Sequence, residues 1–306
     1  MVKVLNLTML DPPICQFGII GVTTDYEAPA IRAELQKLIN DGPAIRPDGT
    51  EIYEVSGTRN GAAGSYKIAL RILGQDGNLH CAMETTNFLA RYNPVFVFLV
   101  GIAGGMNPAR ANIGDVIASS GISHQEFYRI DTGYNVGRRN RDLKVTPTVQ
   151  TEFGTFRGTF SFDTPTSTNA SNAKPGPKLI HGRYYNVGAI LECEQTRDKL
   201  LENDRDLVAV EMESGGFMKA VEYHQKFDRR PKHFVEAMVI KGISDFACHS
   251  LHEDPFLKVQ AKKQAALNAA FVMRSFVEFL ASRPRIVPGL PSPYQALGGL
   301  RPDRRM

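Results

Sequence analysis

The segment Val100-Gly-Ile-Ala-Gly-Gly105, followed by Ile113-Gly-Asp-Val116, decides the fold of this 306-residue chain. An apolar run begins at Val95 and leads into these glycines, which predicts a buried strand, a short loop and a second strand. Glycines at the end of a strand let a ligand approach the backbone closely and expose amide donors. The segment therefore favours a binding site at a strand end, with an ordinary turn between strands as the alternative.

Short runs that are apolar throughout predict strands buried on both faces of a sheet. These runs are Phe17–Val22, Val95–Val100, Val116–Ala118, Val208–Val210 and Ala237–Ile243. Apolar residues at helical spacing between them predict helices over Glu27–Leu38, Leu79–Tyr92, Ser214–Tyr223 and Phe256–Leu280. Strands that alternate with helices indicate an α/β domain.

Two stretches interrupt this alternation. Residues 129–183 read as a polar insertion, in which we expect a β-hairpin over Val145–Val149 and Thr155–Phe162. The insertion holds nine Lys and Arg against four Asp and Glu, a net charge of +5 that exceeds the +4 of the whole chain. Five prolines mark residues 283–306 as a tail that cannot be helical.

Composition excludes several classes of protein. The four cysteines form no C-x-x-C pair and the histidines show no ligand spacing, so we expect no metal, cofactor or disulfide framework. The longest apolar run is about half of what a membrane span needs, and no secretory signal is visible. A net charge of +4 is too small to argue for nucleic acid. We therefore expect a cytoplasmic protein that binds neither nucleic acid nor membranes.

Carboxylates follow two of the predicted strands. In Ala209-Val-Glu-Met-Glu-Ser-Gly215, Glu211 and Glu213 leave an apolar strand, where a sugar diol is a suitable partner for a carboxylate. Both could instead be acids at the start of a helix, favoured by its dipole. In Val239-Ile-Lys-Gly-Ile-Ser-Asp-Phe-Ala247, Asp245 lies at the carboxyl end of a strand, where α/β sheets bind ligands. The alternative is that Asp245 caps a turn.

Together, and in this order, the three motifs resemble the nucleoside phosphorylase and nucleosidase superfamily. The chain looks most similar to the methylthioadenosine/S-adenosylhomocysteine nucleosidase branch, over residues 15–128 and 186–281. The resemblance implies one catalytic domain, residues 1–282, folded as a three-layer αβα sandwich around a central mixed β-sheet. It also implies cleavage of the N-glycosidic bond of a purine nucleoside or nucleotide, and a homodimer or larger homo-oligomer.

The resemblance assigns a role to each matching residue. Asp245, oriented by Ser244, would be the general acid at purine N7, and its pKa would be raised by partial burial. Glu213 would hold the ribose 2′- and 3′-hydroxyls, with Met212 packed on the sugar. Glu27, or alternatively Asp25, would hold the attacking water. The remaining residues expected to contact substrate are Ala103, Gly104, Glu211 and Phe246.

Phosphorylases of the bacterial type place a phosphate-binding Arg two residues before the first glycine of the V-G-x-x-G motif. Here that position is Leu99, and Gly21-Val-Thr-Thr-Asp25 replaces the phosphate loop near the N-terminus. Phosphate without such donors would be poorly stabilised. Water is therefore the expected nucleophile, and a phosphorylase remains the second hypothesis.

The chain departs from the nucleosidase pattern at Leu191-Glu-Cys-Glu-Gln-Thr196, where the family has S-G-D-x-F. The base pocket must then differ, and Phe160, Phe162 or Tyr185 could stack on the base. A sensor that binds a nucleotide without catalysis is the third hypothesis. The insertion carries three clustered arginines that could hold a substrate phosphate, with a solvated loop as the alternative; they are Arg138, Arg139 and Arg141. His124 and Tyr128 could also face the ligand.

Overall fold

The computed structural model describes residues 15–59, 62–130, 136–162, 176–188, 191, 193–227, 234–247 and 254–283. The strands of this part of the chain are β1 Phe17–Gly21, β2 Ala44–Ile45, β3 Glu51–Arg59, β4 Ala62–Ile72, β5 Phe96–Gly105, β6 Val116–Ile130, β7 Val136–Leu143, β8 Leu179–Asn186, β9 Leu207–Glu211 and β10 Glu236–Phe246. The helices are α1 Glu27–Gln36, α2 Asn78–Tyr92, α3 Pro147–Thr159, α4 Glu194–Asn203, α5 Ser214–Phe227 and α6 Pro255–Ala281.

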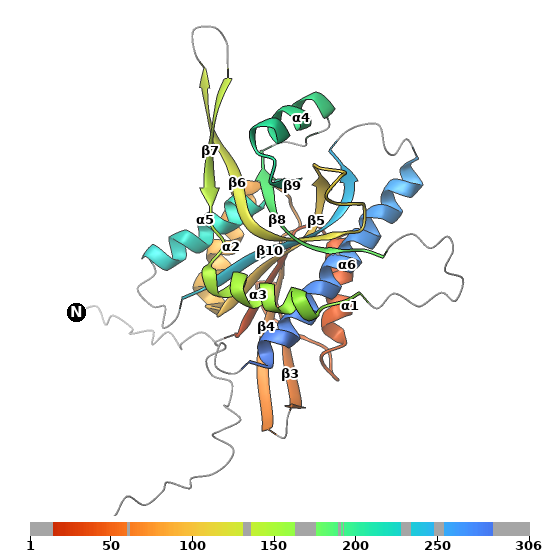
Figure 1. Cartoon of the computed structure of the whole chain (residues 1–306). Coiled ribbons are helices and arrows are strands. Elements are labelled where there is room, and N and C mark those ends of the chain that lie inside the picture. Colours follow the sequence, from red (N-terminus) through yellow and green to blue (C-terminus); the bar gives the residue numbers. More distant parts are fainter. Residues whose placement is uncertain are drawn as a thin grey trace, which may run out of the picture.

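The strands form one mixed sheet in the order β10-β6-β8-β9-β5-β1-β4-β3-β2, with β7 paired to β6 (Figure 1). Strand β1 runs parallel to β4 and β5, and β5 runs parallel to β10. Because β5 also pairs antiparallel with β9, strands β5, β10, β6, β8 and β9 close into a ring. This closure brings the carboxyl ends of β5, β9 and β10 to one place.

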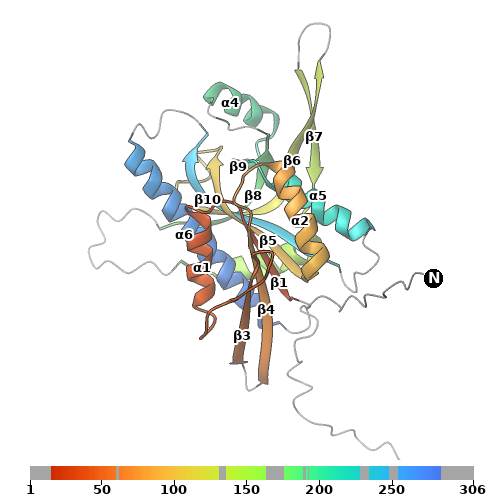
Figure 2. The ribbon, with the colours of Figure 1, turned by 180° about the vertical axis from the view of Figure 1, so that it is seen from behind.

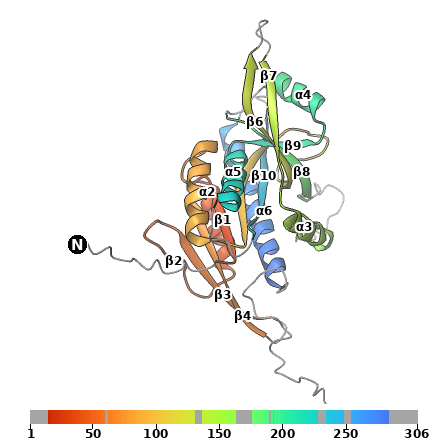
Figure 3. The same cartoon turned by 90° about the vertical axis from the view of Figure 1, so that its left-hand side faces the viewer.

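Helices cover both faces of the sheet. Figure 2 shows α1 beside α6 on one side of the sheet and α2 with α5 on the other, and Figure 3 gives the side view. The side chains of β5 divide between the two layers, since Phe96 and Phe98 pack with α1, α3 and α6, whereas Val97 and Leu99 pack with α2 and α5. A fully apolar strand is what two covered faces require. The predicted three-layer αβα sandwich is confirmed.

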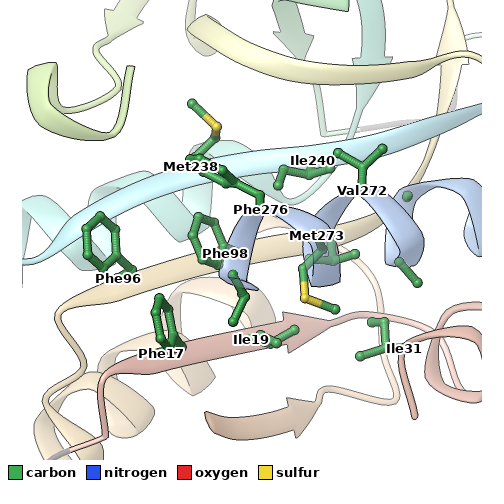
Figure 4. Packing of buried hydrophobic residues seen from close by; sticks show 14 of the residues in the cluster. Phe17, Ile19, Ile31, Phe96, Phe98, Met238, Ile240, Val272, Met273 and Phe276 are labelled. Carbon is green, nitrogen blue, oxygen red and sulfur yellow. The ribbon is translucent and has the colours of Figure 1, made fainter. Parts of the chain in front are cut away.

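Aromatic side chains dominate the layer between the sheet and α6. Phe276 of α6 lies against Phe98 with ring centroids 5.7 Å apart, and Phe17 stacks on Phe96 at 5.9 Å (Figure 4). All four rings are fully buried. The helix is fixed at its start by Asp254, whose side chain accepts a hydrogen bond from the amide of Phe256 at 2.8 Å.

The hairpin expected over Val145–Val149 and Thr155–Phe162 is wrong, because most of this segment forms helix α3. Pro147 lies in its first turn, where the missing amide proton costs nothing. Val149, Phe153 and Phe156 follow at helical spacing and are buried, and Phe153 packs edge-on against Phe276 at 5.3 Å. The β-branched residues favoured a strand locally, but an apolar stripe facing α6 decides for a helix.

The five strands and four helices expected from the apolar runs are present. Their ends are displaced by up to five residues, except that the strand expected over Val116–Ala118 continues to Ile130. Strands β2, β3 and β4, which pair in antiparallel fashion, and helix α4 were not predicted. The polar stretch 129–183 also contributes β7 and most of β8 to the sheet. The tail from 284 and Cys248 lie outside the described residues. No helix of the described part is long and apolar enough to cross a membrane.

Candidate active site

A cavity of about 240 Å³ opens where the carboxyl ends of β5, β9 and β10 meet the loop between β1 and α1. It is lined by carboxylates, small residues of the glycine motif and a few apolar side chains. The described lining residues are Val22, Thr23, Glu27, Asp76, Ile102, Ala103, Gly104, Leu191, Val210, Glu211, Met212, Glu213, Ser244, Asp245, Ala247 and Lys262.

Asp245 reaches the cavity because of the strand pairing beneath it. Gly104 of β5 lies opposite Asp245 in the parallel pair with β10, and opposite Val210 in the antiparallel pair with β9. A Cβ atom added to Gly104 would lie 3.2 Å from Asp245 Oδ1, closer than most side chains allow. The Ser244 hydroxyl donates to Asp245 Oδ2 at 2.7 Å. The glycine therefore leaves room for a carboxylate whose orientation its neighbour fixes.

Glu27 begins α1, but its side chain folds back onto the end of β5. Its Oε2 accepts hydrogen bonds from the amides of Val22 at 2.7 Å and Thr23 at 2.8 Å, and its Oε1 accepts from the amide of Ile102 at 2.9 Å. A Cβ atom on Gly101 would overlap Glu27 Oε1. Gly101, the first glycine of the motif, thus leaves room for the carboxylate of Glu27 against the strand, as well as for a ligand.

The pKa of Glu27 is raised above its ordinary value of 4.5, because burial penalises the charged form. Lys241 and the amides of Thr23 and Ile102 oppose this shift, and the neighbouring Glu213 adds to it. A carboxylate with a raised pKa is a better proton acceptor than an exposed glutamate. Glu27 is therefore suited to hold and deprotonate a water molecule.

A buried ammonium group organises the other two glutamates. Lys241 of β10 is 1% exposed, and its Nζ lies 2.7 Å from Glu213 Oε2 and 3.1 Å from Glu211 Oε2. The second oxygen of Glu213 accepts from the amide of Gly77 at 3.2 Å. Burial alone would lower the pKa of Lys241, but the surrounding carboxylates hold it well above its ordinary value. The ammonium group is therefore charged and permanently paired.

Glu211 is held more completely than Glu213. It accepts hydrogen bonds from the amides of Glu213 and Ser214, from the Ser214 hydroxyl, and from Asn186 Nδ2 at 2.8 Å. Burial would raise its pKa, yet Lys241, Ser214 and Asn186 lower it below the ordinary value. Glu211 thus remains ionised and anchors Lys241, while Glu213 keeps more of its hydrogen-bonding capacity for a ligand.

Eight of the residues predicted from the sequence line this one cavity: Glu27, Ala103, Gly104, Glu211, Met212, Glu213, Ser244 and Asp245. Phe246 follows them but is not among the described lining residues. Of the two acids considered for the water site, Glu27 lies in the cavity, whereas Asp25 is exposed and accepts from the hydroxyl of Thr24 at 3.2 Å.

The expected base-stacking rings lie elsewhere. Phe160 and Phe162 pack against Phe271 of α6 with centroids 5.7 and 5.9 Å away. Tyr185 is buried and is not among the described lining residues, although it belongs to the apolar cluster that includes Val210 and Ala247 of the cavity wall. His124 is buried, and its Nδ1 lies 2.6 Å from Asn186 Oδ1. Because Asn186 donates to Glu211, His124 supports the hydrogen bonds that hold Glu211. The side chains of Tyr128, Arg138, Arg139 and Arg141 lie outside the described part of the structure.

Sequence reasoning missed the polar lining residues Thr23, Asp76 and Lys262, and Lys241, which pairs with the lining glutamates. It also missed the apolar lining residues, which are Val22, Ile102, Leu191, Val210 and Ala247. One signal was present, because Lys241 interrupts an otherwise apolar strand and a lysine is rarely buried without a carboxylate partner. Nothing in the local pattern of α6 distinguishes Lys262 from the lysines beside it. Among the described residues, no group of His, Cys, Asp and Glu could hold a metal ion.

The arrangement combines three chemical capacities. Asp245 can exchange a proton at one end of the cavity, Glu213 can accept hydrogen bonds from hydroxyls, and Glu27 can orient water. Five carboxyl groups line the cavity, and two lysines lie in or beneath it. Negative charge in a partly enclosed site stabilises a cationic transition state. The cavity is therefore suited to heterolysis that builds positive charge on the ligand.

Comparison with known proteins gives relatives of one kind. A death domain-containing ATP nucleosidase of Amphimedon queenslandica is 27% identical over 184 residues, which are 57% of this chain and 32% of that protein. The chain thus matches only about a third of the length of that relative. A 5′-methylthioadenosine/S-adenosylhomocysteine nucleosidase of Desulfotalea psychrophila is 22% identical over 204 residues, 67% of this chain and 77% of that protein.

Solved structures share the fold. The 5′-methylthioadenosine/S-adenosylhomocysteine nucleosidase of Colwellia psychrerythraea in complex with adenine has a TM-score of 0.59 at 19% identity, and the superposition covers 89% of this chain and 98% of the other. The family model described as the phosphorylase superfamily matches residues 16–278, which include every lining residue of the cavity. This chain therefore belongs to the phosphorylase superfamily.

Proposed function

We propose that the protein is a hydrolase that cleaves the N-glycosidic bond of a purine nucleoside or nucleotide and releases the free base. One observation carries the proposal: Asp245, Glu213 and Glu27 come from three distant parts of the chain and line a single cavity. An acid, a diol acceptor and a water holder are the three groups that such a hydrolysis needs.

Asp245 acts at the base. Protonation of purine N7 by its carboxyl group makes the base a better leaving group as the bond to C1′ lengthens. Ser244 donates to Asp245 Oδ2, which orients the carboxyl group that transfers the proton. The main chain of Ala103 and Gly104 forms the floor under the base, since both residues line the cavity and have little or no side chain.

Glu213 acts at the sugar. Its carboxylate accepts hydrogen bonds from the 2′- and 3′-hydroxyls, and Met212 packs on the ribose beside it. The sugar becomes cationic as the base departs, so the carboxylates around it stabilise the transition state more than the ground state. Lys241 keeps Glu213 in place through the contact of 2.7 Å and prevents two buried carboxylates from repelling each other.

Glu27 acts on water. Its Oε1 accepts one protein hydrogen bond, from Ile102, and so retains a lone pair for the nucleophile. The raised pKa of Glu27 lets it take the water proton as the oxygen attacks C1′. The products are the free base and the sugar with a hydroxyl at C1′. The proton lost from water balances the proton that Asp245 delivers to the base.

Phosphorolysis is the second candidate, and the lining chemistry disfavours it. No arginine lines the cavity within the described residues. Leu99 is buried in β5, in a layer that faces α2 and α5. Both sequence relatives described above are named as nucleosidases, and adenine is bound in the similar structure. Water is therefore the proposed nucleophile and an adenine-type base the proposed leaving group.

The test is base release, followed by chromatography, from adenosine, inosine, guanosine, methylthioadenosine, AMP and ATP, each with and without phosphate. We expect release without phosphate, and a loss of about 10²- to 10⁴-fold in kcat for Asp245→Asn, which keeps the shape but cannot donate the proton. Release that depends strictly on phosphate would make the protein a phosphorylase. Tight binding of nucleotides without any turnover would identify a sensor.

We also propose a homo-oligomer. Helices α2 and α5 pack side by side and present exposed apolar residues, namely Leu79, Met83, Tyr223 and Phe227. An apolar surface of this kind on paired helices is typical of a protein interface. Light scattering should give a mass of two or more chains, and Leu79→Glu with Tyr223→Glu should reduce it. A monomeric wild-type protein would contradict this.

A further inference from the structure

The cavity holds one cation that the proposed chemistry does not use. Lys262 of α6 lines the cavity, and within the described residues no carboxylate pairs with it. Its Nζ lies 5.8 Å from the ring centroid of Tyr26, in the loop between β1 and α1. By contrast, Lys241 is already paired with two glutamates. Lys262 is therefore the ammonium group that remains available to a ligand.

A second group on the same side also lacks a partner. Thr23 lines the cavity, and its Oγ1 is buried without a hydrogen bond to any described residue. The amide of Thr23 is already donated to Glu27. A buried hydroxyl without a partner is costly and points to a ligand that satisfies it.

The position of these two residues selects one end of the substrate. Asp245 takes the base and Glu213 takes the two ribose hydroxyls, so the 5′ position is the part of the substrate left for Lys262 and Thr23. An ammonium group and a hydroxyl would be poor neighbours for an apolar 5′ substituent, because both would lose hydration without gaining a partner. They suit an anionic 5′ group, since charge-assisted hydrogen bonds to phosphate are among the strongest in proteins.

The carboxylates restrict where a phosphate could bind. Five carboxyl groups line the cavity and would repel a phosphate placed near them. A nucleotide can bind only if its phosphate sits at the wall where a cation offsets that repulsion. We propose that the substrate carries a 5′-phosphate and that Lys262, with Thr23, binds it. This inference rests on the proposed N-glycosidase function and names the class of its substrate, a 5′-phosphorylated purine nucleoside.

The experiment compares AMP, ATP and adenosine as substrates of wild type, Lys262→Met and Thr23→Val. Methionine keeps the length of the side chain and removes the charge, and valine keeps the shape of threonine without the hydroxyl. We expect the ratio of kcat/KM for AMP to that for adenosine to fall about tenfold or more in Lys262→Met, and less in Thr23→Val. Lys263→Met is the matched control, because Lys263 is the next residue of α6, carries the same charge and is exposed outside the cavity.

Two outcomes overturn the inference. One is an equal loss for AMP and adenosine in Lys262→Met, which would mean that Lys262 serves the fold or the base. The other is a strict need for inorganic phosphate, with its KM raised by Lys262→Met, which would make Lys262 the holder of a phosphate nucleophile. The ratio of ATP to AMP in the same assay shows whether the site accepts a monophosphate or a longer chain.

A measurement that involves no base separates this inference from the proposed function. Calorimetric titration with ribose 5-phosphate and with ribose tests the phosphate site directly. We expect wild type and Lys263→Met to bind ribose 5-phosphate more tightly than ribose, and Lys262→Met to lose that preference. If no purine compound is cleaved, the proposed function fails while this titration still decides the phosphate site. Equal binding of both sugars by wild type would overturn the inference.

Discussion

At the scale of single residues, the site depends on one buried lysine. Lys241 lies among Glu27, Glu211 and Glu213, three carboxylates that could not be brought together in a buried site without a cation. Its charge offsets the repulsion between these carboxylates, and it limits the rise in the pKa of Glu27. Lys241 is therefore a positioning residue, which holds Glu213 by an ion pair and lowers the pKa of Glu27.

Replacing Lys241 by methionine should move the pH dependence of catalysis. Glu27 must be ionised to accept a proton, and its raised pKa places the acidic limb of kcat/KM above 4.5 in the wild type. The ammonium group lowers the pKa of Glu27, so its removal should shift this limb to higher pH. The pH dependence of kcat/KM would be measured for Lys241→Met, Lys241→Arg and Lys263→Met. The acidic limb should shift only in Lys241→Met.

The same variant should be less stable. Removing one partner of a buried ion pair costs about 3–5 kcal/mol, because the other charges stay buried without compensation. The folded pKa of Lys241 is raised and that of Glu211 is lowered. The ion pair therefore contributes its full stability at pH values between the ordinary pKa of a glutamate and that of a lysine. Its contribution is lost as the pH falls through the folded pKa of Glu211. If Lys241→Met remains folded and the acidic limb of its kcat/KM profile is unchanged, then Lys241 does not control the pKa of Glu27.

At the scale of elements, the end of β5 shows why the glycine motif is needed. Gly101 admits the carboxylate of Glu27 against the strand, and Gly104 admits Asp245. The sequence suggested that these glycines let a ligand approach the backbone, but two of them make room for the side chains of two acids that line the cavity. A strand end with side chains at these positions would displace both groups from the cavity.

Gly101→Ala should therefore abolish most activity. The added methyl group overlaps the end of the Glu27 side chain, which can move but then loses its hydrogen bonds to three amides. We expect kcat to fall by at least about tenfold, because the water is no longer held. Gly121→Ala in β6 is the control, since its nearest contact would be an ordinary 3.9 Å. Full activity of Gly101→Ala would show that the position of Glu27 is unimportant.

At the scale of the whole molecule, the layer between the sheet and α6 holds the strand ends in register. Phe276 contacts Phe98 of β5 and both Phe153 and Phe156 of α3. It therefore joins three elements that are far apart in the chain. The cavity lies at the edge of this layer, where α6 supplies Lys262.

Phe276→Ala should cost about 3–5 kcal/mol of the free energy of unfolding, because it leaves a cavity in a fully buried aromatic cluster. Urea unfolding of this variant would be compared with that of Phe256→Ala, which removes a ring that is 66% exposed on the same helix. The control should change stability by less than about 0.5 kcal/mol. A small loss in Phe276→Ala would mean that the layers can repack without this ring.

The sequence by itself determined the αβα architecture and most of the site. Buried strands require apolar residues on both faces, and carboxylates at their ends are conspicuous against them, which is how Glu213 and Asp245 were found. The helix at 147–159 was not predicted because its apolar stripe is short and because the segment is rich in threonine. Only burial against α6 separates it from a strand. Local patterns carry information about periods of a few residues and none about such distant contacts.

Only the tertiary structure decided which of these residues meet. The pairing of β5 with both β9 and β10 closes the ring of five strands and places Glu27, Glu213 and Asp245 around one cavity. This depends on pairing between segments more than a hundred residues apart. The choice of Glu27 over Asp25 follows from three amide hydrogen bonds that form only in the folded chain. The same holds for Lys262, one of several lysines in α6, which the fold alone turns toward the substrate cavity.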